Sequence, residues 1–156
     1  MASSFHIASN IGHQVLLYPL FGGEIPTPSE VKLGNSSLFF DYKTLRLAFR
    51  LFLPKEEYSL DHSAVNPLIK GECPPGMPPT LTITAEHDMT KDRTIAYNVF
   101  LRRLGVEAQN LDYKDAAHGF ASMEVLMNSR EAEGCAEDIA IWVHKHISPK
   151  GGELSY

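Results

Sequence analysis

Residues 80–88 read TLTITAEHD, a short apolar run rich in β-branched residues that ends in Asp88. Its length and its β-branched residues predict a buried strand over 80–85. A second, weaker strand is predicted over 108–113, and the pair His118-Gly119 follows soon after it. The chain therefore places an acid after one predicted strand and a histidine after the next.

The apolar spacing on either side of these residues predicts one more strand and three helices. The strand is predicted over 14–20, and the helices over 41–53, 92–104 and 131–147. Asp92 is predicted to cap the second helix, with Ile95 and Val99 facing inward. The Gly- and Pro-containing segment 21–29 and the proline-rich segment 55–79 are predicted to be loops.

This alternation of strands and helices predicts an α/β fold. It favours βαβ units with right-handed crossovers and a parallel sheet of about three strands, flanked by helices. In such sheets ligands bind beyond the carboxyl ends of the strands. Asp88 and His118 both fall just past predicted strand ends, so we expect them at the same rim of the sheet.

The bulk composition excludes some classes of function. The chain has 156 residues, 44% of them hydrophobic and 21% charged, and a net charge of −5, which gives nucleic acid no basic surface to bind. Its apolar runs are too short to span a bilayer, and its first residues lack a secretory signal. Cys73 and Cys135 are widely spaced, so we expect a reducing compartment, the cytoplasm. Residues 1–13 and 149–156 are predicted to be disordered or loose.

Asp88 and His118 suit two roles of a hydrolytic triad, the acid that orients a histidine and the histidine that moves the proton. In one class of α/β enzymes the chain order is nucleophile, acid, base, and here the acid precedes the base. A simpler interpretation makes Asp88 a helix cap and His118 an ordinary loop residue. Asp92 and Asp115 are the competing carboxylates, the first assigned to a cap and the second to a turn.

Other candidates are weaker. His87 adjoins Asp88, but its side chain should point away from its neighbour's. His144 and His146 are two positions apart on a predicted helix and diverge, so they cannot chelate one metal ion. We expect no metal site and no cofactor, and we interpret Gly22-Gly23 as part of a turn. Four phenylalanines are assigned to core or lid: Phe39, Phe40, Phe49 and Phe52.

Several motifs together resemble one known family. They are NPL at 66–68, MPPTLTITAEHD at 77–88, LGV at 104–106 and HGF at 118–120. This pattern resembles the C-terminal half of the hormone-sensitive-lipase-like (fold-3) α/β-hydrolases, and looks closest to the plant carboxylesterases, a group that also includes the gibberellin receptors. The resemblance implies a partial α/β-hydrolase domain over 14–148, with part of a lid region at about 27–54.

By the same resemblance, Asp88 and His118 are the acid and the base of a Ser-Asp-His triad, and the three strands are the sixth, seventh and eighth of the family sheet. Met89 departs from the Pro that commonly follows the acid. The family's other motifs do not occur here: no Ser has Gly at both −2 and +2, and no His-Gly-Gly is present.

These absences leave three hypotheses. The first is a serine carboxylesterase fragment, acting on a small-molecule ester when intact and inactive alone. The second is a non-catalytic, receptor-like binder of small molecules; the hormone receptors lose the catalytic histidine, whereas this chain keeps His118. The third is a remnant without a biochemical role. In each case an open, apolar sheet edge predicts self-association.

Overall fold

The computed structural model describes residues 11–35, 40–72 and 75–147. In chain order the elements are β1 (Gln14–Leu17), α1 (Pro28–Leu33), α2 (Tyr42–Phe52), the 3-10 helix η2 (Lys55–Glu57), β2 (Thr80–His87), α3 (Lys91–Arg103), β3 (Ala108–Ala117) and α4 (Arg130–Ile147). Most of the predicted segments 1–13 and 149–156 lies outside the described residues.

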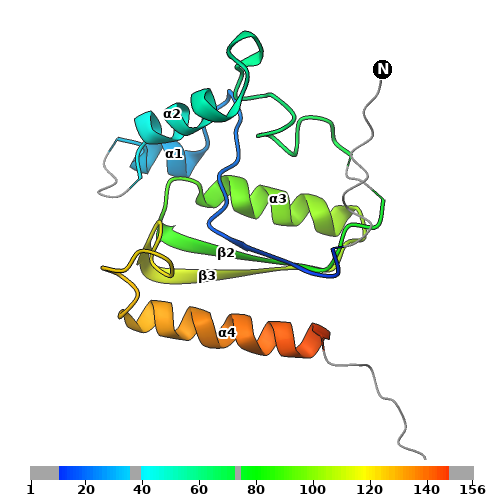
Figure 1. Ribbon diagram of the computed structural model, residues 1–156, viewed down its shortest axis with the longest axis vertical. Coiled ribbons are helices and arrows are strands. Elements are labelled where there is room, and N and C mark those ends of the chain that lie inside the picture. The colour runs from blue at the N-terminus through cyan, green and yellow to red at the C-terminus, as the bar shows by residue number, and fades with distance from the viewer. Residues whose placement is uncertain (1–10, 36–39, 73–74, 148–156) are drawn as a thin grey trace, which may run out of the picture.

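The three strands form one parallel sheet in the order β1-β2-β3, which confirms the predicted α/β fold. Helix α3 covers one face of the sheet and α4 the other, while α1 and α2 lie together beyond the end where β2 runs into α3 (Figure 1). All three strands therefore point their carboxyl ends toward the same rim. This is the rim where the sequence places its acid and its histidine.

The central strand β2 is buried on both faces, and its side chains alternate between them. Leu81, Ile83 and Ala85 belong to a hydrophobic core that includes Trp142 of α4. The threonines of β2 alternate with them and meet α3, where the Asn98 side chain donates a hydrogen bond to Thr82. A second core packs α2 and the loops after it around the buried Met89.

The polar face of β2 explains one difference from the sequence prediction. Ile95 and Val99 were predicted to face inward on α3, but the buried residues of this helix are Thr94, Tyr97, Asn98 and Leu101. The helix is rotated by about one position from the predicted face. The polar residue Asn98 is accommodated on this face because its side chain donates a hydrogen bond to the hydroxyl of Thr82 on the sheet beneath it.

The strand limits also differ from the predicted ones. β1 ends at Leu17, not at residue 20, because Tyr18 has a positive φ of 36° and Pro19 cannot continue a ladder. β3 continues to Ala117, four residues past its predicted end, with a register shift opposite Ala85 and His87. That extension brings the strand directly to His118.

Helix α1 was missed, because 21–29 was assigned to a loop. Its signal is nevertheless in the sequence: Thr27 and Glu30 form a reciprocal capping box, and Pro28 occupies the first turn. The helix has six residues, too few to show an apolar period. It lies within the predicted lid region 27–54, which also contains α2.

A buried ion pair ties α1 to α3. The guanidinium of Arg93 donates to both carboxylate oxygens of Glu30, at 2.5 and 2.8 Å, and to the backbone carbonyls of Gly22, Gly23 and Ile25. The Glu30 side chain is 1% exposed and that of Arg93 11%. Since both charges are desolvated, removing either partner leaves the other uncompensated.

We expect Glu30→Gln to lower the free energy of unfolding by about 3 kcal/mol, the size typical of breaking a buried pair. Lys91→Met is the control, because the pair of Lys91 with Asp112 is more exposed and should be worth about 1 kcal/mol or less. Urea unfolding followed by circular dichroism measures both. Equal effects of the two substitutions would contradict the expectation.

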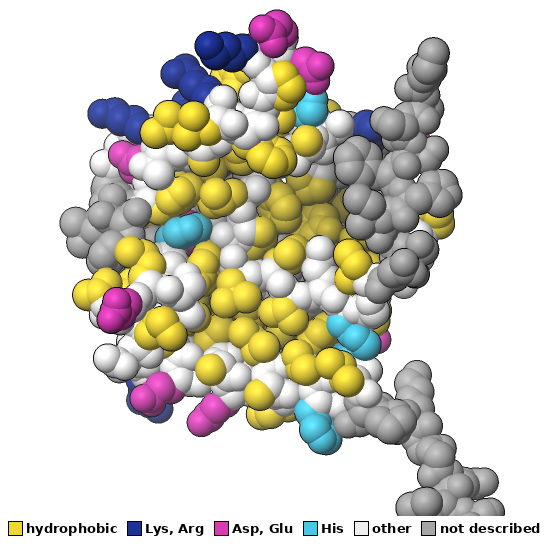
Figure 2. Space-filling model, in the orientation of Figure 1, with side chains coloured by type: hydrophobic (Ala, Val, Ile, Leu, Met, Phe, Trp, Pro, Cys, Tyr) yellow, Lys and Arg dark blue, Asp and Glu magenta, His cyan; other side chains and the backbone are white. Residues whose placement is uncertain are grey.

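Among the described residues, β1 pairs with β2 alone, so its outer edge carries unpaired backbone groups. Hydrophobic side chains spread over the face of the molecule that β1 crosses (Figure 2). Open apolar edges of this kind recruit further strands.

We therefore expect copies of the chain to self-associate through β1, as measured by light scattering. Leu16→Lys should shift the population toward monomer, because Val15 and Leu17 pack against the core and Leu16 belongs to neither core cluster. Val31→Lys, on an exposed helix position, is the matched control and should leave association unchanged. A stable wild-type monomer would contradict this expectation.

Candidate active site

The structure brings Asp88 and His118 together at the carboxyl rim of the sheet. Asp88 directly follows β2, and His118 directly follows β3. Nδ1 of His118 lies 2.8 Å from Oδ2 of Asp88. The adjacent parallel strands therefore deliver the two residues from thirty positions apart in sequence to hydrogen-bond contact.

The surroundings of Asp88 decide how the pair shares its protons. Its side chain is 1% exposed, and its Oδ1 accepts hydrogen bonds from the backbone N–H and the hydroxyl of Thr90, at 2.8 and 2.9 Å. A carboxylate can only accept, so Nδ1 of His118 donates to it. In that tautomer Nε2 carries the lone pair, and Nε2 makes no hydrogen bond to any described residue.

Two aromatic rings hold the imidazole of His118. Phe40 stacks on it with a centroid distance of 4.3 Å and an interplanar angle of 17°. Tyr18 meets it edge-on at 4.9 Å and 60°. The side chain of His118 stays 15% exposed, so the ring is confined on its faces but remains accessible.

The turn after His118 requires glycine. Gly119 has a φ of 84°, and a Cβ at this position would lie 2.6 Å from the sulfur of Met123. The chain then folds back so that Ser122 accepts a hydrogen bond from the Tyr18 hydroxyl. The end of β1 is thus fastened to the loop that carries the histidine.

The two competing carboxylates have other partners. Asp92 was predicted to cap α3, but the N-cap of that helix is Thr90. The carboxylate of Asp92 accepts a hydrogen bond from the backbone N–H of Ser29 at 2.8 Å, in the first turn of α1. This hydrogen bond forms because the first N–H groups of a helix have no partner within the helix. Asp115 has a positive φ of 58° in the irregular end of β3, and its backbone N–H donates to Glu86.

The remaining sequence candidates lie apart from this pair. His87 is exposed and, with Glu86 and Asp115, forms the one group of potential metal ligands among the described residues. All three side chains are exposed, and such surface groups commonly occur without an ion. The pair Gly22-Gly23 lies in a loop, where its carbonyls accept hydrogen bonds from Arg93.

Of the four phenylalanines assigned to core or lid, Phe49 is buried, Phe52 is 67% exposed and Phe40 stacks on His118. Phe39 lies outside the described residues. Sequence reasoning missed the contacts of Phe40, Tyr18 and Thr90 with the site. Only Thr90 had a local signal, since its hydroxyl is two residues from Asp88 and such side chains commonly hydrogen-bond nearby groups.

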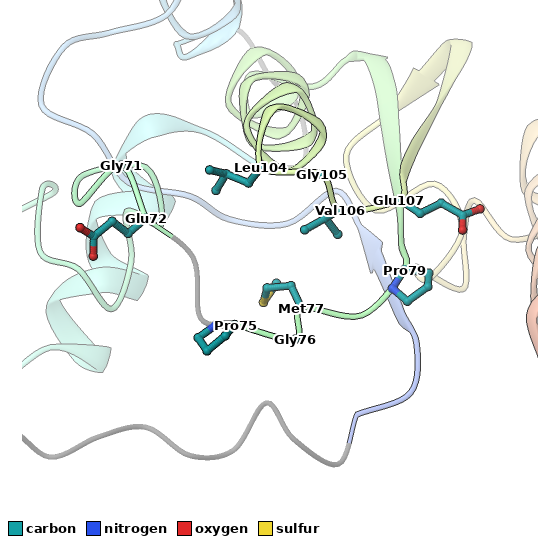
Figure 3. Close-up of a pocket in the computed structure, with 10 residues that line it drawn as sticks. All are labelled: Gly71, Glu72, Pro75, Gly76, Met77, Pro79, Leu104, Gly105, Val106 and Glu107. Atoms are coloured by element: carbon teal, nitrogen blue, oxygen red, sulfur yellow. The ribbon is translucent and has the colours of Figure 1, made fainter.

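A pocket at the other end of the sheet is a separate feature. It lies between the residues that precede β2 and the turn that follows α3. Met77 and Val106 point into it, while Glu72 and Glu107 point away (Figure 3). Because it lies at the amino end of β2, it is remote from Asp88 and His118.

The described part of the chain has no helix long and apolar enough to cross a membrane. Cys135 is free and buried, and burial raises the pKa of its thiol. Burial also raises the pKa of Tyr113, as does its hydrogen bond to Asp138. These groups lie between the sheet and α4, away from the acid and the histidine.

Comparison with known proteins shows the family to which the chain belongs. Residues 2–122 match a family model described as alpha/beta hydrolase fold. The chain belongs to the α/β-hydrolase family, in the hormone-sensitive-lipase-like branch with the plant carboxylesterases. It is 55% identical over 145 residues to probable carboxylesterase 11 of Arabidopsis thaliana, covering 92% of this chain and 31% of that protein.

Two further similarities agree with this membership. A gibberellin receptor of Arabidopsis thaliana is 34% identical over 109 residues, which cover 68% of this chain and 30% of the receptor. The crystal structure of carboxyl esterase 2 from the fungus Tuber melanosporum matches with a TM-score of 0.73 and 26% identity, covering 86% of this chain and 43% of that one. The chain spans about a third of the length of the curated relatives it matches.

Tyr18 gives a pH-dependent test of the site's packing. Burial raises the pKa of its hydroxyl above the usual value. Above about pH 10 the unfolded chain loses this proton while the folded chain keeps it, so stability falls as the pH rises. We expect Tyr18→Phe to be about 1 kcal/mol less stable at pH 8, through the lost Ser122 hydrogen bond. That gap should narrow above pH 10, as measured by urea unfolding; a constant gap would contradict the expectation.

Proposed function

We propose that Asp88 and His118 are the acid and the base of a Ser-Asp-His triad, and that the chain is part of a serine carboxylesterase. One observation carries the proposal. A buried carboxylate and a partly exposed imidazole are hydrogen-bonded at 2.8 Å beyond the carboxyl ends of neighbouring parallel strands. Membership of the α/β-hydrolase family and similarity to plant carboxylesterases support it.

The proposed reaction uses the free nitrogen of His118. Nε2 takes the proton of a serine hydroxyl as the serine oxygen attacks the ester carbonyl, and then gives that proton to the departing alcohol. The same nitrogen next activates a water molecule that releases the acid and frees the serine. Throughout, Asp88 keeps Nδ1 protonated and stabilises the imidazolium that forms when Nε2 is protonated.

The sequence contains no motif for the nucleophile of the proposed triad. No serine of the chain has Gly at both −2 and +2, and no His-Gly-Gly stretch could form an oxyanion hole. We propose that both come from a segment outside these 156 residues. The fact that the chain spans about a third of its curated relatives supports this.

The apolar groups near His118 suggest the kind of ester. Phe40 and Tyr18 flank the ring, and the adjoining helix α2 exposes Leu47, Leu51 and Phe52. We propose that α1 and α2 form part of a lid over a substrate with a small to medium apolar acyl group. Apolar walls of this kind are typical of small-molecule sites.

The isolated chain should have negligible esterase activity, because loss of the nucleophile and the oxyanion hole removes the main catalytic contributions. Turnover of a p-nitrophenyl ester by the purified chain measures this. Robust turnover that disappears in His118→Ala would refute the proposal as stated and would point to an unrecognised nucleophile within the chain.

A chimera tests the roles of the two residues directly. In it, residues 14–147 replace the matching segment of probable carboxylesterase 11 of Arabidopsis thaliana. We expect His118→Ala and Asp88→Asn to lower kcat by roughly 10³-fold or more relative to the unmodified chimera. His87→Ala and Asp115→Asn are matched controls, since both side chains are exposed and neither shares a hydrogen bond with the pair among the described residues; their kcat should stay unchanged. Loss of activity in the controls alone would contradict the assignment.

We further propose that the protein acts in the cytoplasm on a small-molecule ester, without a cofactor. Free, buried Cys135 fits a reducing compartment. Fluorescence microscopy of a tagged full-length protein in plant cells tests the location, and a secretory or organellar pattern would overturn it.

A further inference from the structure

The hydroxyl of Thr90 is engaged in an unusual way for its position. Thr90 is the N-cap of α3, where a threonine side chain commonly accepts a hydrogen bond from the first turn of the helix. Here it makes no such bond. Its Oγ1 instead donates to Oδ1 of Asp88 at 2.9 Å, beside the donation from its own backbone N–H at 2.8 Å.

This arrangement is fully buried. Thr90 is 0% exposed and Asp88 1%, so water does not replace a missing donor at the carboxylate. The two donors from Thr90 both go to Oδ1, which leaves Oδ2 for Nδ1 of His118. The carboxylate is therefore fixed in rotation about its Cβ–Cγ bond, with one oxygen assigned to each partner.

The backbone around Thr90 is held independently. The hydroxyl of Ser29 donates to the carbonyl of Met89 at 2.7 Å, and the carboxylate of Asp92 accepts from the backbone of Ser29. The loop from β2 to α3 is thus fastened to α1 without any contribution from the Thr90 hydroxyl. Removing this hydroxyl should therefore leave Oδ1 of Asp88 with one donor, the backbone N–H of Thr90, and loosen the carboxylate while the loop keeps its path.

We propose that Thr90 is a positioning residue whose hydroxyl keeps Oδ2 of Asp88 on Nδ1 of His118. The inference rests on the proposed function of the pair, and it adds a residue that acts through Asp88 without touching substrate. The hydroxyl donates to the carboxylate of Asp88 and does not cap α3. A purely structural threonine at this position would cap α3.

The test is proton NMR of the whole chain, which follows the Nδ1–H proton of His118. A proton held by a buried carboxylate gives a far-downfield resonance that exchanges slowly with water. We expect Thr90→Val to speed this exchange about tenfold or to broaden the resonance away, the order expected for losing one hydrogen bond to a charged group. Thr90→Ser, which keeps the hydroxyl, should restore the wild-type resonance.

Thr94→Val is the matched control, because Thr94 is equally buried and its hydroxyl donates to the Thr90 carbonyl, away from the acid. It should leave the resonance unchanged. Near-ultraviolet circular dichroism checks that each variant folds, and Thr90→Ala replaces the valine variant if that one does not.

The outcomes separate this inference from the proposed function. A resonance that disappears in Asp88→Asn but is unchanged in folded Thr90→Val and Thr90→Ala overturns the role of Thr90 alone. A resonance that is absent from the wild type, or survives Asp88→Asn, overturns the hydrogen-bonded pair and the proposed triad with it. Loss in Thr90→Val with rescue by Thr90→Ser supports both.

Discussion

The site depends on one constraint, the parallel pairing of β2 with a strand on each side. β2 is buried along most of its length, so its register is fixed by packing on both faces as well as by its hydrogen bonds. Parallel pairing brings all carboxyl ends to one rim, where β1 delivers Tyr18, β2 delivers Asp88 and β3 delivers His118. The contact between Asp88 and His118, and one of the two rings that confine the imidazole, are therefore consequences of the sheet.

Outside the sheet, polar contacts fix the loop that carries the acid. Ser29 and Asp92 connect α1 to the start of α3, and the buried pair of Glu30 with Arg93 holds the same two helices together. Under the proposed function Asp88 must hold its histidine in one orientation, and a loop fixed in this way would serve that role. Helix α1, which lies in the predicted lid region, is in this way fastened to the loop that carries Asp88.

The sequence allowed the three strands, three of the helices and the pair Asp88–His118 to be predicted, because these depend on local periodicity and on motif order. It failed where tertiary contacts overrode local preference. Asp92 looked like the cap of α3, yet its carboxylate accepts a hydrogen bond from the first turn of α1. The inward face of α3 was misplaced, because hydrophobic period alone does not reveal that the sheet beneath it presents threonine hydroxyls.

By itself the sequence determined the fold class and the family resemblance, and it singled out Asp88 and His118 as the candidate pair, since each depends on short runs of residues with a particular spacing. Only the tertiary structure decided that Phe40 and Tyr18 confine the imidazole and that the Thr90 hydroxyl turns to the acid rather than to its helix. The physical reason is distance along the chain. Stacking and buried hydrogen bonds depend on which distant segments share a dry space, and a one-dimensional pattern does not contain that information.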